Sequence, residues 1–184
     1  MKTNNRIWIY SLIVVVSVLI LFNTCEKQGR YDLFPLKVGN EFYYKYDNSR
    51  RNFGLESDTK GTKTWKVVSE SLQGNSINYI IEQNLNGTLI VNGPFGDTTL
   101  ITDSITQLQI IENKSTSAIS VFGFNFKRYQ DVSQIELEQQ GYTDAPSLTC
   151  IFKADSGMTR YNYYFSTQQI LYESLQLDSL KTFN

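Results

Sequence analysis

The chain contains no histidine. Catalytic triads with an imidazole base are therefore excluded, and the common zinc and non-haem iron sites, which draw on histidine, are not expected. The sequence also has no glycine-rich phosphate loop, no dinucleotide-binding fingerprint and no EF-hand loop. We therefore expect neither a bound metal nor a cofactor, and any catalysis would have to rely on carboxylates.

Cysteine is scarce, with only Cys25 and Cys150 in the chain. Because Cys25 directly follows a hydrophobic leader, Cys150 is left alone in the mature domain and an internal disulfide is not expected. Alternation places Cys150 on the same face as Leu148 and Phe152. We therefore predict that Cys150 is a small buried hydrophobic residue and not a reactive nucleophile.

The chain has no excess of positive charge, since it contains 18 acidic residues against 17 Lys and Arg. Its basic doublets, Arg50-Arg51 and Lys127-Arg128, are interpreted as solvated charges of a loop and a strand end. Nucleic acids and anionic lipid surfaces select proteins with a basic face. No nucleic-acid partner is therefore expected.

The first residues are typical of an export signal. Lys2 and Arg6 precede an apolar run over residues 7–22, which is shorter than the roughly 20 residues of a membrane-spanning helix. A short basic region followed by an apolar run of this kind is the plan of a signal peptide. We predict a helical signal peptide over residues 1–24.

The segment Leu21-Phe22-Asn23-Thr24-Cys25 resembles the lipobox of bacterial lipoproteins, with Phe22 where Leu is usual and Thr24 where a small residue is usual. The resemblance implies that the Cys25 thiol carries acyl chains such as palmitate and becomes the mature N-terminus. It places the protein in the cell envelope, anchored to a membrane through the lipid, with the outer membrane favoured. An uncleaved signal anchor and a cleaved, released protein are the alternatives.

Behind a flexible spacer over residues 25–33, one domain is predicted over residues 34–184, a length within the usual single-domain range. Short segments rich in Tyr, Phe, Ile, Val and Thr alternate with turn residues, and no amphipathic helix lies between them. This pattern predicts an all-β fold: a single antiparallel meander sheet curled into a barrel or half-barrel, with a sandwich as the alternative.

Several local features of this meander are predicted. Residues 48–61 are expected to form a long surface loop, and Asn86-Gly87 is the strongest hairpin signal of the chain. Separate strands are expected at residues 98–102 and 107–111, and one strand at residues 119–126. Residues 132–140 fit a helix and a strand equally well.

The segment from Pro35 to Tyr44 resembles the opening of small uncharacterised bacterial lipoproteins, which begin with a "P-L-x-x-G-N-x-W-x-Y" stretch soon after the lipid-bearing cysteine. Pro35, Leu36, Gly39, Asn40 and Tyr44 match this pattern, and Phe replaces Trp at position 42. The resemblance implies an envelope lipoprotein domain. It carries no activity with it.

Two clusters are candidates for a ligand or reaction site. Tyr161, Tyr163 and Phe165 alternate along one strand face and would suit stacking on sugar rings, although cross-strand aromatic pairing explains the same pattern. Glu136 and Glu138 share a face if their segment is a strand, as a glycosidase pair requires. A solvated charged face is the alternative for them.

Three short segments resemble the D-S/T-apolar sites that some Gram-negative bacteria O-glycosylate after export. They centre on Thr98, Ser104 and Ser179, each of which follows an Asp. These three hydroxyls are candidate O-glycosylation sites.

Together these features predict a non-catalytic envelope lipoprotein whose β-domain binds an unknown ligand or protein partner. A carboxylate-dependent, glycosidase-like hydrolase and a purely structural envelope protein are the alternatives. A deep cavity with clustered acids would favour the hydrolase. A filled core with an exposed aromatic surface would favour binding.

Overall fold

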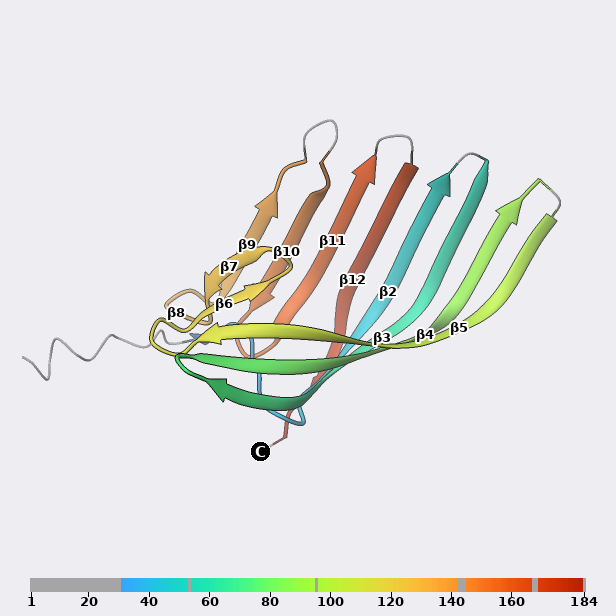
Figure 1. Cartoon of the computed structure of the whole chain (residues 1–184). Coiled ribbons are helices and arrows are strands. Elements are labelled where there is room, and N and C mark those ends of the chain that lie inside the picture. The colour runs from blue at the N-terminus through green and yellow to red at the C-terminus, as the bar shows by residue number, and fades with distance from the viewer. Residues whose placement is uncertain (1–30, 53, 95, 142–144, 167–168, 184) are drawn as a thin grey trace, which may run out of the picture.

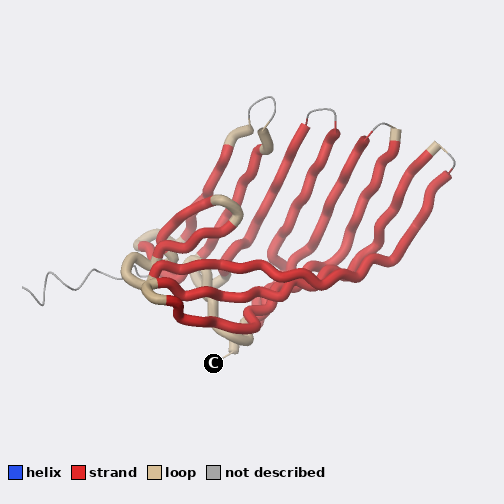
Figure 2. Tube along the Cα trace, viewed as in Figure 1, coloured by secondary structure: helices blue, strands red, loops and turns tan. Residues whose placement is uncertain are grey.

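The computed structural model describes residues 31–52, 54–94, 96–141, 145–166 and 169–183. All regular structure in these residues is β-strand (Figure 2), and none of them forms a helix that could span a membrane. The predicted signal peptide and Cys25 lie outside the described residues. The strands are β1 (Tyr31–Asp32), β2 (Glu41–Asn52), β3 (Leu55–Gln73), β4 (Ser76–Gly93), β5 (Gly96–Asn113), β6 (Ala118–Val121), β7 (Phe124–Lys127), β8 (Tyr129–Gln130), β9 (Gln134–Gln139), β10 (Ser147–Lys153), β11 (Gly157–Ser166) and β12 (Gln169–Lys181).

Ten of these strands form one antiparallel sheet in the order β7-β6-β5-β4-β3-β2-β12-β11-β10-β9, and β1 pairs with β8. Strands that follow one another are neighbours from β2 to β7 and from β9 to β12, and β12 joins the two runs by pairing with β2. The sheet curls until the β6–β7 hairpin approaches β10, where the rings of Phe126 and Phe152 lie 4.5 Å apart. The predicted all-β meander, curled almost into a barrel, is confirmed.

The sheet has two regions, visible in Figure 1. In what we call the barrel half, β3, β4 and β5 bend over and the sheet wraps around a core. In what we call the extension, which comprises the described residues of 46–63, 84–107 and 163–173, the same strands continue as a single layer that ends in the β2–β3, β4–β5 and β11–β12 turns. The two regions therefore share strands but not a core.

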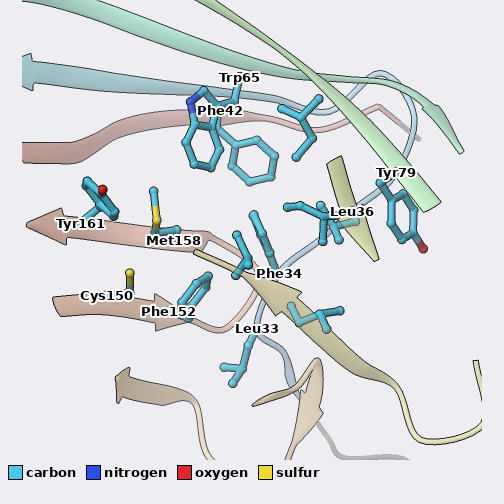
Figure 3. Close-up of a cluster of buried hydrophobic side chains, with 14 of the residues drawn as sticks. Leu33, Phe34, Leu36, Phe42, Trp65, Tyr79, Cys150, Phe152, Met158 and Tyr161 are labelled. Atoms are coloured by element: carbon cyan, nitrogen blue, oxygen red, sulfur yellow. The ribbon is translucent and has the colours of Figure 1, made fainter. Parts of the chain in front are cut away.

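Aromatic and aliphatic side chains fill the barrel half (Figure 3). Phe34, which precedes β2, lies between the rings of Phe42 and Phe152, with centroid distances of 5.7 and 5.5 Å. Leu33 beside it is also fully buried. Tyr31 to Leu33 therefore belong to the folded domain, although sequence analysis places them in the spacer.

The matched residues of the "P-L-x-x-G-N" stretch form a turn that leads into β2. The Asn40 side chain is buried, donates to the Pro35 carbonyl at 2.8 Å and accepts from the Phe183 amide at 3.0 Å. Gly39 has a φ of 96°, in the region that favours glycine. This part of the pattern has a structural explanation, because it joins the start of the domain to its C-terminal end.

The Asn86-Gly87 hairpin prediction is wrong, because both residues lie inside β4. Gly87 pairs directly with Gly61 of β3, and a Cβ added at Gly61 would lie 2.2 Å from the Asn86 carbonyl oxygen. Only glycine permits two backbones to approach so closely. The glycine that is typical of a tight turn serves close contact between two long strands here.

Other boundaries differ for related reasons. Residues 48–61 are not a loop, because β2 and β3 run through them and their charges pair across the strands, as Arg51 and Glu56 do at 3.2 Å. Residues 98–111 lie in one strand, β5. Residues 119–126 form the β6–β7 hairpin, with φ values of 52° at Phe122 and 81° at Gly123. Residues 134–139 form strand β9, so the segment 132–140, which fitted a helix and a strand equally well, contains a strand.

Candidate functional site

The inner face of the sheet runs from the barrel half onto the extension. Directly paired residues of antiparallel strands share a face, so Tyr161, opposite Leu175, and Tyr163, opposite Glu173, lie on it together. Phe165 follows by the two-residue alternation of a strand. Tyr161 is buried, whereas Tyr163 and Phe165 are half-buried. The three predicted ligand-binding residues thus share one face, and two of them have accessible surface.

Four aromatic rings mark the boundary between the two regions. We call Tyr44, Trp65, Phe122 and Tyr161 the aromatic floor, because they close the barrel half below the extension. Successive ring centroids are 5.0, 5.6 and 4.9 Å apart, and the planes are tilted by 57°, 43° and 48°. In Figure 3 the indole nitrogen of Trp65 lies at the Tyr161 end of the core, away from Tyr79.

Two polar atoms of the aromatic floor have no hydrogen-bond partner among the described residues, the Tyr44 hydroxyl and the Trp65 Nε1. Both side chains are fully buried, and burial raises the pKa of Tyr44 well above its usual value. Buried polar groups of this kind nearly always have a partner, which is protein or ordered water. The aromatic floor therefore contains two buried polar groups that the described residues leave without a hydrogen bond.

An ion pair lies above the floor on the inner face. The Lys63 Nζ is 3.5 Å from a Glu173 carboxylate oxygen, and both side chains are largely shielded, with exposures of 17% and 25%. The same Nζ lies 5.3 Å from the centroid of the Tyr46 ring. Burial, and next the charge of Glu173, raise the pKa of Tyr46 to about 12. Lys63 and Glu173 therefore pair with each other, and Arg50, opposite Leu171, adds an exposed positive charge further along the same face.

Apolar side chains continue this face along the extension. Alternation places several half-buried or exposed aliphatic residues on it: Leu85, Leu89, Val91, Leu100 and Leu171. The opposite face has cross-strand ion pairs, such as Arg51–Glu56 at 3.2 Å and Lys60–Asp47 at 4.0 Å. The extension is thus a single layer whose inner face carries aromatic and aliphatic side chains beside the Lys63–Glu173 pair. Its outer face mixes ion pairs with exposed apolar residues such as Ile90 and Ile101.

The carboxylate candidates lie away from this face. Glu136 is opposite Ile151 and Glu138 is opposite Thr149, so both point to the outer face, and both are exposed. Their segment is a strand, as the glycosidase interpretation requires, but they line no enclosed site with the inner-face aromatics. Within the described ranges, no group of three or more His, Cys, Asp or Glu could hold a metal ion.

A second polar cluster, which sequence analysis missed, lies at the opposite end of the barrel half. Arg128 is only 7% exposed and binds both carboxylate oxygens of Asp32, at 2.9 and 2.8 Å. It also donates to Glu112 at 2.9 Å and to the Tyr79 hydroxyl at 3.2 Å. The interpretation of Arg128 as a solvated charge is therefore wrong, because its three partners come from segments that are distant in the sequence.

Cys150 is fully buried, and burial raises the pKa of its thiol to about 12. It shares the inner face with the buried residues Leu148 and Phe152. At neutral pH the thiol stays protonated, and only the thiolate is a nucleophile. The prediction of a small buried hydrophobic residue is confirmed.

The candidate O-glycosylation sites are all exposed. Thr98 and Ser104 lie in β5 and Ser179 lies in β12. These three residues remain candidates, because their exposure permits modification but does not require it.

Comparison with known proteins adds no relative to these observations, because no protein-family model matches the chain and no curated protein is significantly similar to it.

Proposed function

We propose that this protein is a non-catalytic lipoprotein of the bacterial cell envelope, anchored through Cys25, whose β-domain binds a ligand or partner on the inner face of the extension. The observation that carries the proposal is the combination of a filled core with an accessible aromatic and apolar face above it. Tyr46, Tyr163 and Phe165 provide the aromatic part of that face. Such a surface suits recognition by stacking and apolar contact.

The carboxylates of the described residues support the hydrolase alternative less well. A cavity of about 340 Å³ contains Asp32 and Asp155, but Asp32 is already bound by Arg128. Glu112 accepts from the same guanidinium and from Tyr79. A general acid must be free to transfer its proton to the substrate, whereas Asp32 and Glu112 are both held by the Arg128 guanidinium.

The position of β1 supports a consistent orientation on the membrane. Asp32 accepts at its carbonyl from the Asp155 amide at 2.8 Å, at the turn between β10 and β11, so β1 lies at the end of the sheet opposite the tips of the extension. A chain from Cys25 to Tyr31 reaches at most about 20 Å. Lipidation would therefore hold the closed end of the barrel half near the membrane and direct the extension away from it.

The anchor is tested with the variant Cys25→Ala. We expect the protein from native membranes to lack residues 1–24 and to carry acyl mass at Cys25. The variant should lose that mass and leave the detergent phase on partitioning. Identical mass and partitioning of the two proteins would contradict lipidation and favour an uncleaved anchor.

The binding face is tested by native purification from membranes, followed by mass analysis of what remains bound. The inner-face variant Tyr46→Ser/Tyr163→Ser should release the bound species. The matched outer-face variant Tyr164→Ser/Tyr172→Ser should retain it. Equal loss from both variants, or a bound species that neither affects, would overturn the proposed face.

A further inference from the structure

The β6–β7 hairpin is attached to the sheet by a short contact. Both strands have four residues, and β6 joins β5 through two register pairs, Ile111 with Ser120 and Glu112 with Ile119. The free side of β7 pairs with no strand of the described residues. A hairpin held in this way opens at a lower free-energy cost than the long strands of the sheet.

The tip of this hairpin supplies one ring of the aromatic floor, Phe122, which packs over the rings of Trp65 and Tyr161. Phe122 has a φ of 52°, which a bulky side chain rarely adopts, and such a backbone costs on the order of 1–3 kcal/mol. In this position its ring lies 5.6 Å from that of Trp65 and 4.9 Å from that of Tyr161. Phe122 therefore acts as a plug whose ring contacts offset a strained backbone.

The atoms under the plug lack a hydrogen-bond partner. The Tyr44 hydroxyl and the Trp65 Nε1 belong to neighbouring rings whose centroids are 5.0 Å apart, and neither atom has a partner among the described residues. A buried polar group without a partner costs about 1–3 kcal/mol. Two such groups on neighbouring rings indicate a hydrogen-bonding species that the described chain does not supply.

We propose that the aromatic floor is a closed binding site for a neutral sugar ring, which enters when the β6–β7 hairpin moves Phe122 off Trp65 and Tyr161. This inference rests on the proposed binding function and names the ligand class. The hydroxyls of a sugar both donate and accept, so they match the Trp65 Nε1 and the Tyr44 hydroxyl. The C–H faces of the ring stack on aromatic side chains.

The geometry and charge of the site favour a sugar over other small ligands. The rings of Tyr44 and Trp65, which stay in place when Phe122 moves away, are tilted by 57° to each other, whereas a flat heterocycle would require parallel walls. Lys63 and Glu173 lie 3.5 Å apart and pair with each other, so neither of these two charges is free for an ionic ligand. A purely apolar ligand would leave both polar atoms unpartnered.

The chain contains two tryptophans, Trp8 and Trp65, so the variant Trp8→Phe makes Trp65 emission the only indole signal. The full chain with this substitution, in detergent micelles, is titrated with glucose, galactose, mannose and N-acetylglucosamine oligosaccharides. Adenosine serves as the flat probe and a fatty acid as the apolar probe. We expect a saturable change in Trp65 emission with at least one saccharide and none with the two other probes.

Two variants link this signal to the floor. Phe122→Ala removes the plug and should bind the saccharide several-fold more tightly, because less free energy is needed to open the site. Tyr44→Phe removes a hydroxyl without a partner, so it should keep the fold and bind several-fold more weakly. Tyr164→Phe, on the outer face, should change neither the fold nor the affinity for the saccharide. If Phe122→Ala does not fold, Tyr44→Phe carries the test.

Other outcomes overturn the inference. No saturable response to any saccharide in either the parent or Phe122→Ala would mean that the floor holds a buried water only. A response to adenosine or fatty acid alone would assign another ligand class, and unchanged affinity in Tyr44→Phe would place the sugar elsewhere. If acylation and the inner-face binding result hold while the sugar response fails, the ligand class is wrong and the proposed function stands.

Discussion

The barrel half and the extension are built from the same strands but differ in burial. In the barrel half, Phe42 and Trp65 are fully buried, whereas in the extension Ile101 is 88% exposed. The transition occurs within single strands, because β2 and β3 contribute to both regions. The strands therefore run on, with the same pairing, beyond the point where the core ends.

This difference shows what holds each region together. Burial of apolar area, at roughly 25 cal/mol per Å², can stabilise the barrel half. A single layer has no second layer to bury against, so the extension depends on backbone hydrogen bonds and on cross-strand pairs, each of which contributes about 0.2–1 kcal/mol. Substitutions in the barrel half should therefore be costly, and those on the faces of the extension should be mild.

The largest effect is expected at the closed end of the barrel half. Arg128→Met leaves the buried carboxylate of Glu112 and the partly exposed carboxylate of Asp32 without their cation, which should lower the free energy of unfolding by about 3–5 kcal/mol. The neighbouring exposed residue provides the control, since Lys127→Met should cost less than about 0.5 kcal/mol. Chemical denaturation of both variants measures the contrast. A loss at Arg128 no larger than at Lys127 would mean that the cluster does not stabilise the fold.

The next effect concerns the point where β3 and β4 meet through glycine. Gly61→Ala places a Cβ 2.2 Å from a backbone oxygen, which cannot move aside without disturbing β4. We expect a loss of about 1–3 kcal/mol, typical of overpacking. Gly93→Ala is the matched variant, because its Cβ would meet only the end of the Leu55 side chain, at 3.3 Å. Thermal melts that rank Gly93→Ala as the worse variant would show that the close approach is not required.

These two sites also show which features the sequence reveals. Periodicity records the faces of a strand, so it places Cys150 correctly in the core and predicts the all-β sheet. It does not record the partner of a strand. Gly87 therefore has the signature of a hairpin turn although it faces Gly61, and Arg128 has the signature of a surface charge although it meets Asp32.

The candidate site was predictable to the same extent. Alternation puts Tyr161, Tyr163 and Phe165 on one face, and the structure places them there. It gives no sign that Phe122 closes the barrel half, because that depends on a turn with positive φ and on rings from three other strands. Alternation also does not show how deeply a side chain is buried, so the buried Tyr161 and the half-buried Tyr163 look alike in the sequence.

A smaller effect is expected from pH. With no histidine in the chain, no ordinary side chain titrates between pH 5.5 and 8, so thermal melts should differ little across that range. Burial raises the pKa of Cys150 to about 12, above its ordinary value of 9.0. Burial and the charge of Glu112 raise the pKa of Tyr79 to about 12, above its ordinary value of 10.0. A raised pKa gives stability that is complete below the unfolded pKa and is lost as the pH rises through the folded pKa.

Urea unfolding should therefore give equal free energies of unfolding at pH 6 and pH 8, and a lower free energy of unfolding at pH 10.5. Cys150→Ala should be less stable overall, yet its decline above pH 9 should be shallower. A clear inflection near pH 6 would instead reveal a carboxylate with a strongly raised pKa, and it would favour the hydrolase alternative.

The smallest effect on stability, but a distinct effect on association, is expected at the free edge of the extension. β5 pairs with β6 only at Ile111 and Glu112, so residues 96–110 have no strand beyond them among the described residues. This stretch contains no Lys, Arg or Pro, the residues that usually protect an edge. It exposes Ile101 by 88% and Ile105 by 65%.

An unprotected, partly apolar edge of this length pairs readily with another strand, so we expect the parent protein to self-associate as its concentration rises. Ile101→Lys places a charge on that edge and should shift the protein towards monomer, while the free energy of unfolding changes by less than about 0.5 kcal/mol. Leu72→Lys is the control, because Leu72 is 60% exposed but lies in β3, away from this edge. Sedimentation velocity over a concentration series measures both. A parent that stays monomeric, or equal dissociation by Leu72→Lys, would show that the edge is protected by its twist and its two aspartates, Asp97 and Asp103, and that the extension needs no partner strand.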